Sequence, residues 1–221
     1  KAIKEAKLFG ELVEVASSKD KNFTYIPKGY DIPSDADYFH CTSNNTIFGT
    51  QIKEFPTLDI PIVCDMSSDI LSRNIDFSKF DLIYAGAQKN IGPAGTTLVI
   101  VKNEILGRTG RKISTMLDYN THISKDSMFN TPPVFSIYVS MLTLQWIKDH
   151  GGIEWIEQIN NQKSELIYNE IDRNPLFEGV ARKEDRSNMN VTFTLTDSTL
   201  EETFNQMWNG AGKIGRASCR E

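Results

Sequence analysis

Short apolar runs separated by long connections constrain the fold of this chain more than any other feature of its sequence. Five runs have the length and composition of strands: residues 11–16, 38–42, 60–64, 82–85 and 97–101. The segments between these runs are too long for tight hairpins, so we expect crossover connections to join most of them. The sequence therefore predicts an α/β fold with a mostly parallel, largely buried sheet and flanking helices.

Two helices are predicted after the last of these runs. Thr131 is followed by two prolines and is expected to cap a helix that continues to His150 and ends at two glycines. This helix is apolar on nearly all sides, which predicts that it is buried in the domain or in a subunit interface. Residues 153–172 predict a second helix, because apolar residues recur there at helical spacing.

The ends of the chain indicate incomplete domains. Residues 1–10 have the pattern of an amphipathic helix with no N-cap before it, so we expect the chain to begin inside a domain. Residues 188–195 alternate apolar with polar side chains, as in a half-exposed strand, and residues 198–208 suggest a helix. We divide the chain into part of a large domain (1–150), a connecting helix (151–181), the start of a small α+β C-terminal domain (182–208) and an atypical, non-native tail (209–221).

Charge and composition exclude several classes of function. The formal net charge is −5, and no basic cluster interleaves with aromatic residues, so no nucleic-acid partner is expected. The apolar stretches are far shorter than the ~20 residues of a membrane span, and no signal sequence opens the chain. We therefore predict a cytoplasmic protein with no membrane partner. The three cysteines show no CxxC spacing, which favours reduced thiols and no metal site.

Two polar residues follow neighbouring runs of the predicted sheet. Asp65 comes directly after one run, and Lys89 lies in a glycine-rich turn after the next. In a parallel sheet both would emerge at the carboxyl edge, where α/β proteins bind ligands. Pyridoxal phosphate chemistry needs such a pair: an amine that bonds the cofactor and a carboxylate that keeps the pyridine nitrogen protonated. Taken alone, the two residues also fit a solvated loop and a helix cap.

Three motifs in order carry a more specific signal. They are residues 65–73 (DMSSDILSR), residues 83–95 (IYAGAQKNIGPAG) and residues 127–133 (SMFNTPP). Together they closely resemble the phosphoserine aminotransferase family, and the resemblance covers residues 1 to about 199. It implies a class V, fold type I pyridoxal-phosphate-dependent transferase that works as a homodimer with shared active sites.

The resemblance also implies a reaction and a set of site residues. In serine biosynthesis, the amino group of glutamate would pass to 3-phosphohydroxypyruvate, giving phosphoserine and 2-oxoglutarate, and the reaction would also run in reverse. Phosphohydroxythreonine, a substrate in pyridoxine biosynthesis, stays open as a second substrate. The matching positions are the Schiff-base and proton-transfer lysine (Lys89), the partner of the pyridine nitrogen (Asp65), a threonine beside the cofactor ring (Thr46), a phosphate ligand (Gln88), and a pair that reaches the phosphate of the neighbouring subunit (Asn130 and Thr131).

The chain departs from the family pattern at both ends. The N-terminal phosphate loop, the stacking aromatic residue and the substrate-binding arginines have no counterpart here, so we expect an internal fragment with impaired turnover. Two alternatives remain. One is another class V aminotransferase or a cysteine desulfurase, although Cys41 and Cys64 lie in predicted strands rather than on a mobile loop. The other is a non-catalytic dimerisation or binding fragment. His40 is interpreted as a structural residue of its strand.

Overall fold

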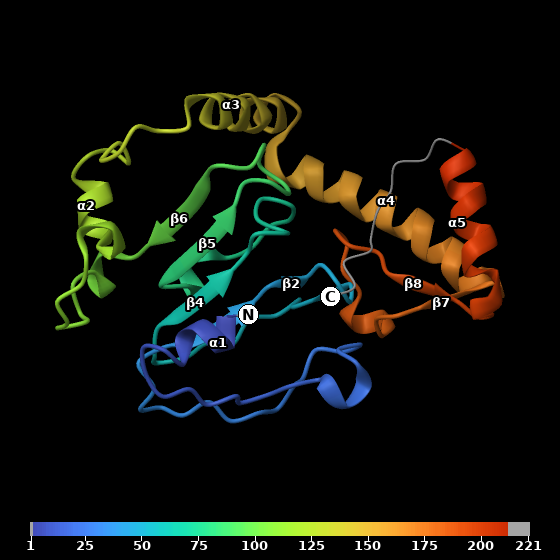
Figure 1. Ribbon diagram of the computed structural model, residues 1–221, viewed down its shortest axis with the longest axis horizontal. Helices are drawn as coiled ribbons and strands as arrows, with labels where there is room; N and C mark the ends of the chain where they lie inside the picture. Colours follow the sequence, from blue (N-terminus) through green and yellow to red (C-terminus); the bar gives the residue numbers. More distant parts are fainter. Residues whose placement is uncertain (1, 212–221) are drawn as a thin grey trace.

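A four-stranded sheet lies at the centre of the computed structural model, which describes residues 2–211 (Figure 1). Its strands stand in the order β1 (Phe39–Thr42), β4 (Ile62–Asp65), β5 (Leu82–Gly86) and β6 (Thr97–Val101). The β1–β4 and β4–β5 pairs are parallel, as the sequence predicted for most of the sheet. The β5–β6 pair is antiparallel.

The direction of β6 is set by the glycine-rich segment before it. Ala87 N donates to Thr96 O at 3.0 Å, and Ile91 N and Gly92 N both donate to Ala87 O. These hydrogen bonds fold the segment into a compact turn that returns the chain beside β5. The prediction of a crossover at this point was therefore wrong, because the turn is closed by its own backbone hydrogen bonds.

The predicted strand at residues 11–16 is absent. This segment pairs with no strand in the described part of the chain, and Val13 is 70% exposed. The two central strands, β4 and β5, alternate buried with less buried residues, which lets one face of the sheet cover a core. That core comprises residues from the sheet and from the connections beneath it: Phe39, Phe55, Ile62, Cys64, Met66, Ile70, Phe80, Ile83, Ala85, Ala87 and Ile91.

Several shorter elements connect the main strands and helices. Between β1 and β4 the chain forms a small hairpin of β2 (Asn44–Asn45) and β3 (Thr50–Gln51). The short helices are α1 (Ala2–Ala6) and α2 (Tyr119–Ile123), and the 3-10 turns are Lys19–Lys21, Phe77–Lys79, Asn103–Ile105, Thr115–Leu117, Lys183–Asp185 and Ser198–Leu200. The N-terminal helix is therefore shorter than the ten residues predicted from the sequence.

Helix α3 (Val134–Asp149) begins two residues later than the sequence predicted, with its N-cap at Pro133 rather than Thr131. Thr131 and Pro132 each precede a proline, and a residue in that position is disfavoured in the helical conformation. Pro133 is the N-cap, and no side chain caps this helix. Thr131 therefore does not have the predicted capping role.

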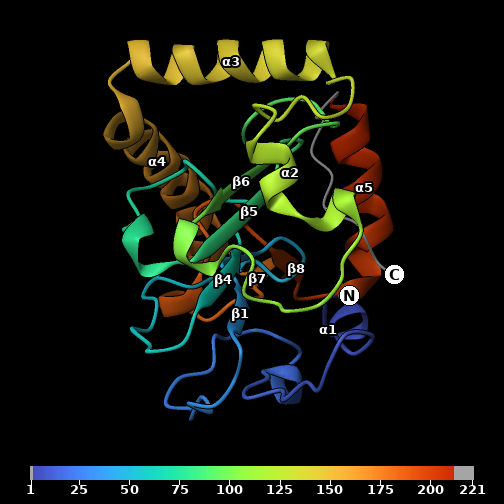
Figure 2. The same cartoon turned by 90° about the vertical axis from the view of Figure 1, so that its left-hand side faces the viewer.

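Helix α3 is also more exposed than its sequence suggested. Phe135 is 73% exposed and Trp146 is 48% exposed, whereas the buried positions are Ser136, Ser140 and Ile147. The helix lies along the outer boundary of the molecule in both Figures 1 and 2. The prediction of burial inside the domain was wrong for this chain, and burial in a subunit interface remains as the alternative.

The C-terminal unit is reached through α4 (Gly152–Arg173). Strand β7 (Phe177–Gly179) pairs antiparallel with β8 (Phe193–Leu195), and α5 (Glu201–Gly210) packs on them through Phe204. Strand β7, the partner of β8, lies before residue 182, the predicted start of the α+β unit. That boundary stays a prediction. Helix α5 includes the first two residues of the predicted tail, and residues 212–221 lie outside the described part of the chain.

Strand β8 is shorter than the predicted strand at residues 188–195. Ser187, Asn190 and Thr192 instead form hydrogen bonds with a loop of the large unit. In the described residues, no helix combines the length and apolar character needed to cross a membrane.

Candidate functional site

Three parallel strands end side by side at one edge of the sheet. Thr42 of β1 is the register partner of Asp65 in β4, and Asp65 is the partner of Tyr84 in β5. The turn after β2, in the connection from β1 to β4, carries Thr46, and the turn after β5 carries Lys89. The parallel direction of β1, β4 and β5 therefore brings three of the predicted site residues to the same carboxyl edge, as expected for ligand sites in α/β sheets.

Lys89 and Thr46 are in direct contact at this edge. Lys89 Nζ donates a hydrogen bond to Thr46 Oγ1 over 2.8 Å. Thr46 lies in a turn closed by Asn45, whose Oδ1 accepts from Ile47 N at 3.0 Å and whose backbone oxygen accepts from Gly49 N at 2.9 Å. The Lys89 side chain is exposed, so its amine is accessible to a small molecule at the sheet edge.

Asp65 is half-buried, and its carboxylate is oriented by the backbone. Asp65 Oδ1 accepts a hydrogen bond from Ser67 N at 2.9 Å. The neighbouring Tyr84 has its pKa raised to about 12, first by burial and then by the negative charge of Asp65. His40 Nε2 lies 3.0 Å from the Tyr84 hydroxyl, and burial lowers the pKa of His40 although Asp65 acts in the opposite direction. His40 and Tyr84 thus form the polar lining beside Asp65.

Gln88 folds back over the end of β5. A Cβ atom on Gly86 would lie 2.5 Å from Gln88 Oε1, so the missing side chain of Gly86 leaves room for the amide in this position. Ser67 Oγ accepts a hydrogen bond from Gly86 N at 3.1 Å. The chain therefore places a side-chain amide, a hydroxyl, an amine and a carboxylate around one strand end.

Asn130 and Thr131 do not join this group. Both are exposed in the segment between α2 and α3, which runs beyond the β6 side of the sheet in Figure 1. Asn130 Nδ2 contacts Met116 Sδ at 3.2 Å. In the described part of the chain, neither residue forms a hydrogen bond with Lys89, Asp65 or Thr46.

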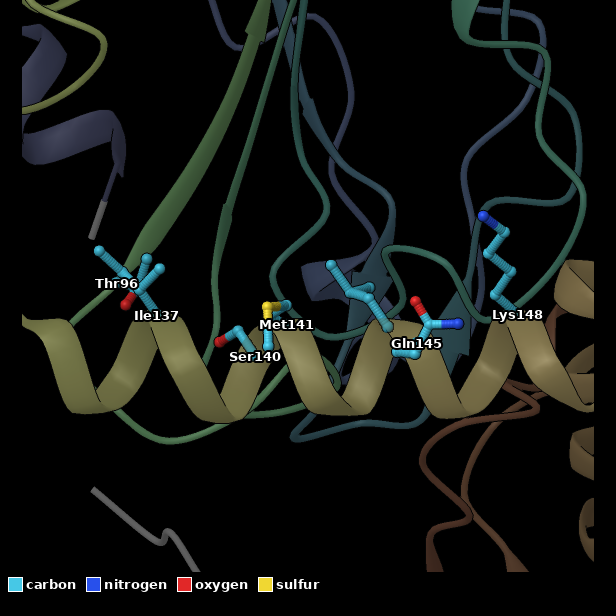
Figure 3. Close-up of a pocket in the computed structure, with 7 residues that line it drawn as sticks. Thr96, Ile137, Ser140, Met141, Gln145 and Lys148 are labelled. Carbon is cyan, nitrogen blue, oxygen red and sulfur yellow. The ribbon is translucent and has the colours of Figure 1, made fainter.

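A pocket elsewhere has no connection with these residues. It lies along α3 and is lined by residues of that helix and by one residue before β6 (Figure 3): Thr96, Ile137, Ser140, Met141, Leu144, Gln145 and Lys148. It shares no residue with the group around Lys89.

Sequence reasoning missed two polar neighbours of Asp65. Tyr84 and Ser67 both lie within the motifs that were recognised, but their side chains were given no role. The alternation of β5 indicates that Tyr84 points away from the core side chains Ile83 and Ala85. The alternation does not predict the register between β4 and β5, and it is this register that places Tyr84 beside Asp65.

The sheet, its helices and the amine–carboxylate edge define the class of the chain. It has the fold of the type I pyridoxal-phosphate-dependent enzymes. The family profile "Aminotransferase class-V" matches residues 10–208, and the chain belongs to this family.

Among curated proteins, the chain is similar to phosphoserine aminotransferases. The protein of Flavobacterium johnsoniae is 70% identical over 214 residues, which are 97% of this chain and 60% of that protein. The protein of Flavobacterium psychrophilum is 68% identical over 219 residues, covering 99% of this chain and 62% of that protein. The chain thus spans about 60% of the length of these relatives.

Solved structures show the same similarity. Phosphoserine aminotransferase from Bacillus circulans subsp. alkalophilus matches with a TM-score of 0.95 and 42% identity, over 99% of this chain and 62% of that one. A phosphoserine aminotransferase studied for radiation damage of its Schiff base matches with a TM-score of 0.95 and 46% identity, over the same shares of the two chains. The fold of this chain is therefore the one that these phosphoserine aminotransferases have over about 62% of their length.

Proposed function

We propose that the protein carrying this chain is a pyridoxal-phosphate-dependent phosphoserine aminotransferase. It would transfer an amino group between phosphoserine and 2-oxoglutarate, giving 3-phosphohydroxypyruvate and glutamate, and the reverse. The observation that carries the proposal is the contact between Lys89 Nζ and Thr46 Oγ1 at the sheet edge that also holds Asp65. The 70% identity to a phosphoserine aminotransferase supports the choice of substrate.

The residues at this edge fit the cofactor chemically. An accessible amine (Lys89) suits the aldehyde, a carboxylate (Asp65) suits the pyridine nitrogen, and a side-chain amide (Gln88) suits the phosphate. Gly86 supports this fit, because its missing Cβ leaves the space in which the Gln88 amide lies against the backbone. When bound, pyridoxal phosphate supplies an electron sink for the substrate α-carbon.

Each side chain has a distinct task in this proposal. Lys89 Nζ, once neutral, takes the proton from the substrate α-carbon and returns it, acting as general base and acid. The Thr46 hydroxyl holds that amine in place through its 2.8 Å hydrogen bond. The Asp65 carboxylate, oriented by Ser67 N, holds a proton at the ring nitrogen of the cofactor.

A second subunit is part of the proposal. The exposed apolar residues of α3 and the exposed Asn130 and Thr131 support a homodimer in which this pair reaches the cofactor phosphate of the neighbouring subunit. We propose that the protein is cytoplasmic. Its partners would be small-molecule substrates and a second copy of the chain, with no nucleic acid or membrane partner.

The geometry gives less support to the alternatives. A cysteine desulfurase needs an exposed nucleophile, but Cys64 is buried, and its hydrogen bond with Cys41 and its burial raise the pKa of its thiol. The third cysteine, Cys219, lies outside the described residues. A purely non-catalytic module would not require an amine held by a hydroxyl at the carboxyl edge.

The decisive experiment is to add pyridoxal phosphate to the chain, reduce with borohydride, and map the modified residue by mass spectrometry. We expect a visible absorption band and labelling at Lys89, both absent in Lys89→Ala. Labelling at another lysine would contradict the assignment. Transamination of phosphoserine should then be measured, and we expect slower turnover than that of a full-length relative.

A further inference from the structure

The C-terminal unit forms hydrogen bonds with the loop that carries Thr46. Asn44 Nδ2 donates to Asn190 Oδ1 at 2.7 Å, and Ser187 Oγ donates to Asn44 Oδ1. Asn44 is 2% exposed and Ser187 is fully buried, so the hydrogen bond between them is shielded from water, whereas the one to Asn190 is partly buried. The amide of Asn44 therefore has both of its polar atoms bound to the C-terminal unit.

The other side of the loop is held through its backbone. Ser187 N donates to Gly49 O at 2.8 Å, and Thr192 Oγ1 donates to Phe48 O at 2.9 Å. Residues 44–49 are thus fixed before and after Thr46, by residues far away in the sequence.

Gly49 makes this close approach possible. It adopts φ +69, in the left-handed region, and a Cβ atom there would lie 2.4 Å from Thr192 Oγ1 and 2.7 Å from Asn190 O. The two segments are therefore in contact without space for any side chain at this position.

Ser187 also orders the segment that makes these contacts. Its Oγ accepts hydrogen bonds from Met189 N at 3.0 Å and Asn190 N at 2.9 Å. One hydroxyl thus closes its own turn and binds the Asn44 amide, which couples the shape of this turn to the Thr46 loop.

We propose that Ser187, Asn190 and Thr192 are positioning residues of the cofactor site, acting through the loop 44–49 on the Thr46 hydroxyl that contacts Lys89. The inference rests on the proposed function, because Thr46 matters only if the Lys89 edge binds pyridoxal phosphate. The C-terminal unit would then contribute to cofactor binding. Its three positioning residues lie outside the large unit, which contains Lys89, Asp65 and Gln88.

The test compares Ser187→Ala and Thr192→Val with the parent chain. Pyridoxal phosphate affinity is measured by absorbance titration, and the mobility of residues 44–49 by hydrogen exchange. We expect the affinity to fall roughly five- to tenfold in each variant, the worth of one or two lost hydrogen bonds, with faster exchange in the loop. Thr192→Ser, which keeps the hydroxyl, should restore both.

Asn160→Ala is the matched control. Asn160 Nδ2 donates to Ser72 O at 3.1 Å and so links α4 to the large unit away from the Thr46 loop. We expect this variant to lose comparable stability but to keep the parent affinity for pyridoxal phosphate.

The outcomes separate the two ideas. If the parent binds the cofactor and Ser187→Ala and Thr192→Val bind it equally well, the inference is wrong and the proposed function stands. An equal loss of affinity in Asn160→Ala would also overturn the inference, since it would reveal general destabilisation. A parent chain that does not bind pyridoxal phosphate would contradict the proposed function, and the inference with it.

Discussion

Lys89 Nζ and Thr46 Oγ1 lie 2.8 Å apart, although one residue follows β5 and the other follows β2. The contact exists because β1 and β5 run in the same direction on either side of β4. The contact holds the Lys89 amine at the carboxyl edge of the sheet, where Asp65 is the last residue of β4. The hydroxyl of Thr46 is therefore the group that holds the Lys89 amine at this edge.

Replacing Thr46 tests this contact. We predict that Thr46→Val slows the reaction of Lys89 with pyridoxal phosphate several-fold, because the amine loses the hydrogen bond that orients it. Stopped-flow absorbance measures this rate. Thr46→Ser keeps the hydroxyl and should react at nearly the parent rate, and equal rates in Thr46→Val and the parent would exclude an orienting role.

Gly49 should be intolerant of any side chain. We predict that Gly49→Ala lowers the free energy of unfolding by more than about 1 kcal/mol, since positive φ and the contacts with Thr192 and Asn190 both oppose a Cβ. Gly29 is a matched control: its φ is +68, but nothing lies within 4 Å of its Cβ position. Urea unfolding should show a smaller loss for Gly29→Ala, and equal losses would mean that crowding contributes nothing.

Arg73 and Asp69 form a buried ion pair, with Arg73 Nη2 and Asp69 Oδ2 3.3 Å apart and the Asp69 side chain fully buried. Arg73→Ala leaves that carboxylate without its cation, so we predict a loss of about 3–5 kcal/mol in the free energy of unfolding. The control is Arg173→Ala, which breaks an exposed pair with Glu170 and should cost less than about 1 kcal/mol. Chemical denaturation compares them; similar losses would contradict the role of burial.

Tyr84 should make stability depend on alkaline pH. Its pKa is about 12 in the folded chain against 10.0 when unperturbed, so the folded state holds the proton more tightly than the unfolded state. This contribution is fully present below pH 10 and is lost as the pH rises towards 12. We predict that the stability of Tyr84→Phe falls less steeply than that of the parent across this range, as measured by urea unfolding at each pH. Parallel curves would show that Tyr84 does not contribute.

The exposed face of α3 should mediate self-association. Phe135 is 73% exposed, and we predict that Phe135→Asp weakens a dimer of the chain by more than tenfold without lowering monomer stability. Analytical ultracentrifugation measures the association, and thermal unfolding provides the control. A parent chain that is monomeric at all concentrations, or a dimer unaffected by the substitution, would place the interface elsewhere.

Much of the fold could be read from the sequence because local patterns reflect local forces. The runs at residues 38–42, 60–64, 82–85 and 97–101 became strands, with ends shifted by no more than two residues. The run at residues 11–16 did not, since a strand needs a hydrogen-bonded neighbour and this segment has none in the described chain. The direction of β6 depended on a turn closed by backbone hydrogen bonds, which periodicity does not encode.

For the candidate site, the sequence by itself determined the chemistry available: an amine at Lys89, a carboxylate at Asp65 and the motifs that relate the chain to aminotransferases. Only the tertiary structure decided which groups meet. Strand register set Tyr84 beside Asp65, and the packing of residues 187–192 fixed the loop of Thr46. The physical reason is that side-chain identity and periodicity are local properties, whereas contacts between distant segments depend on how the whole core excludes water and satisfies its buried polar groups.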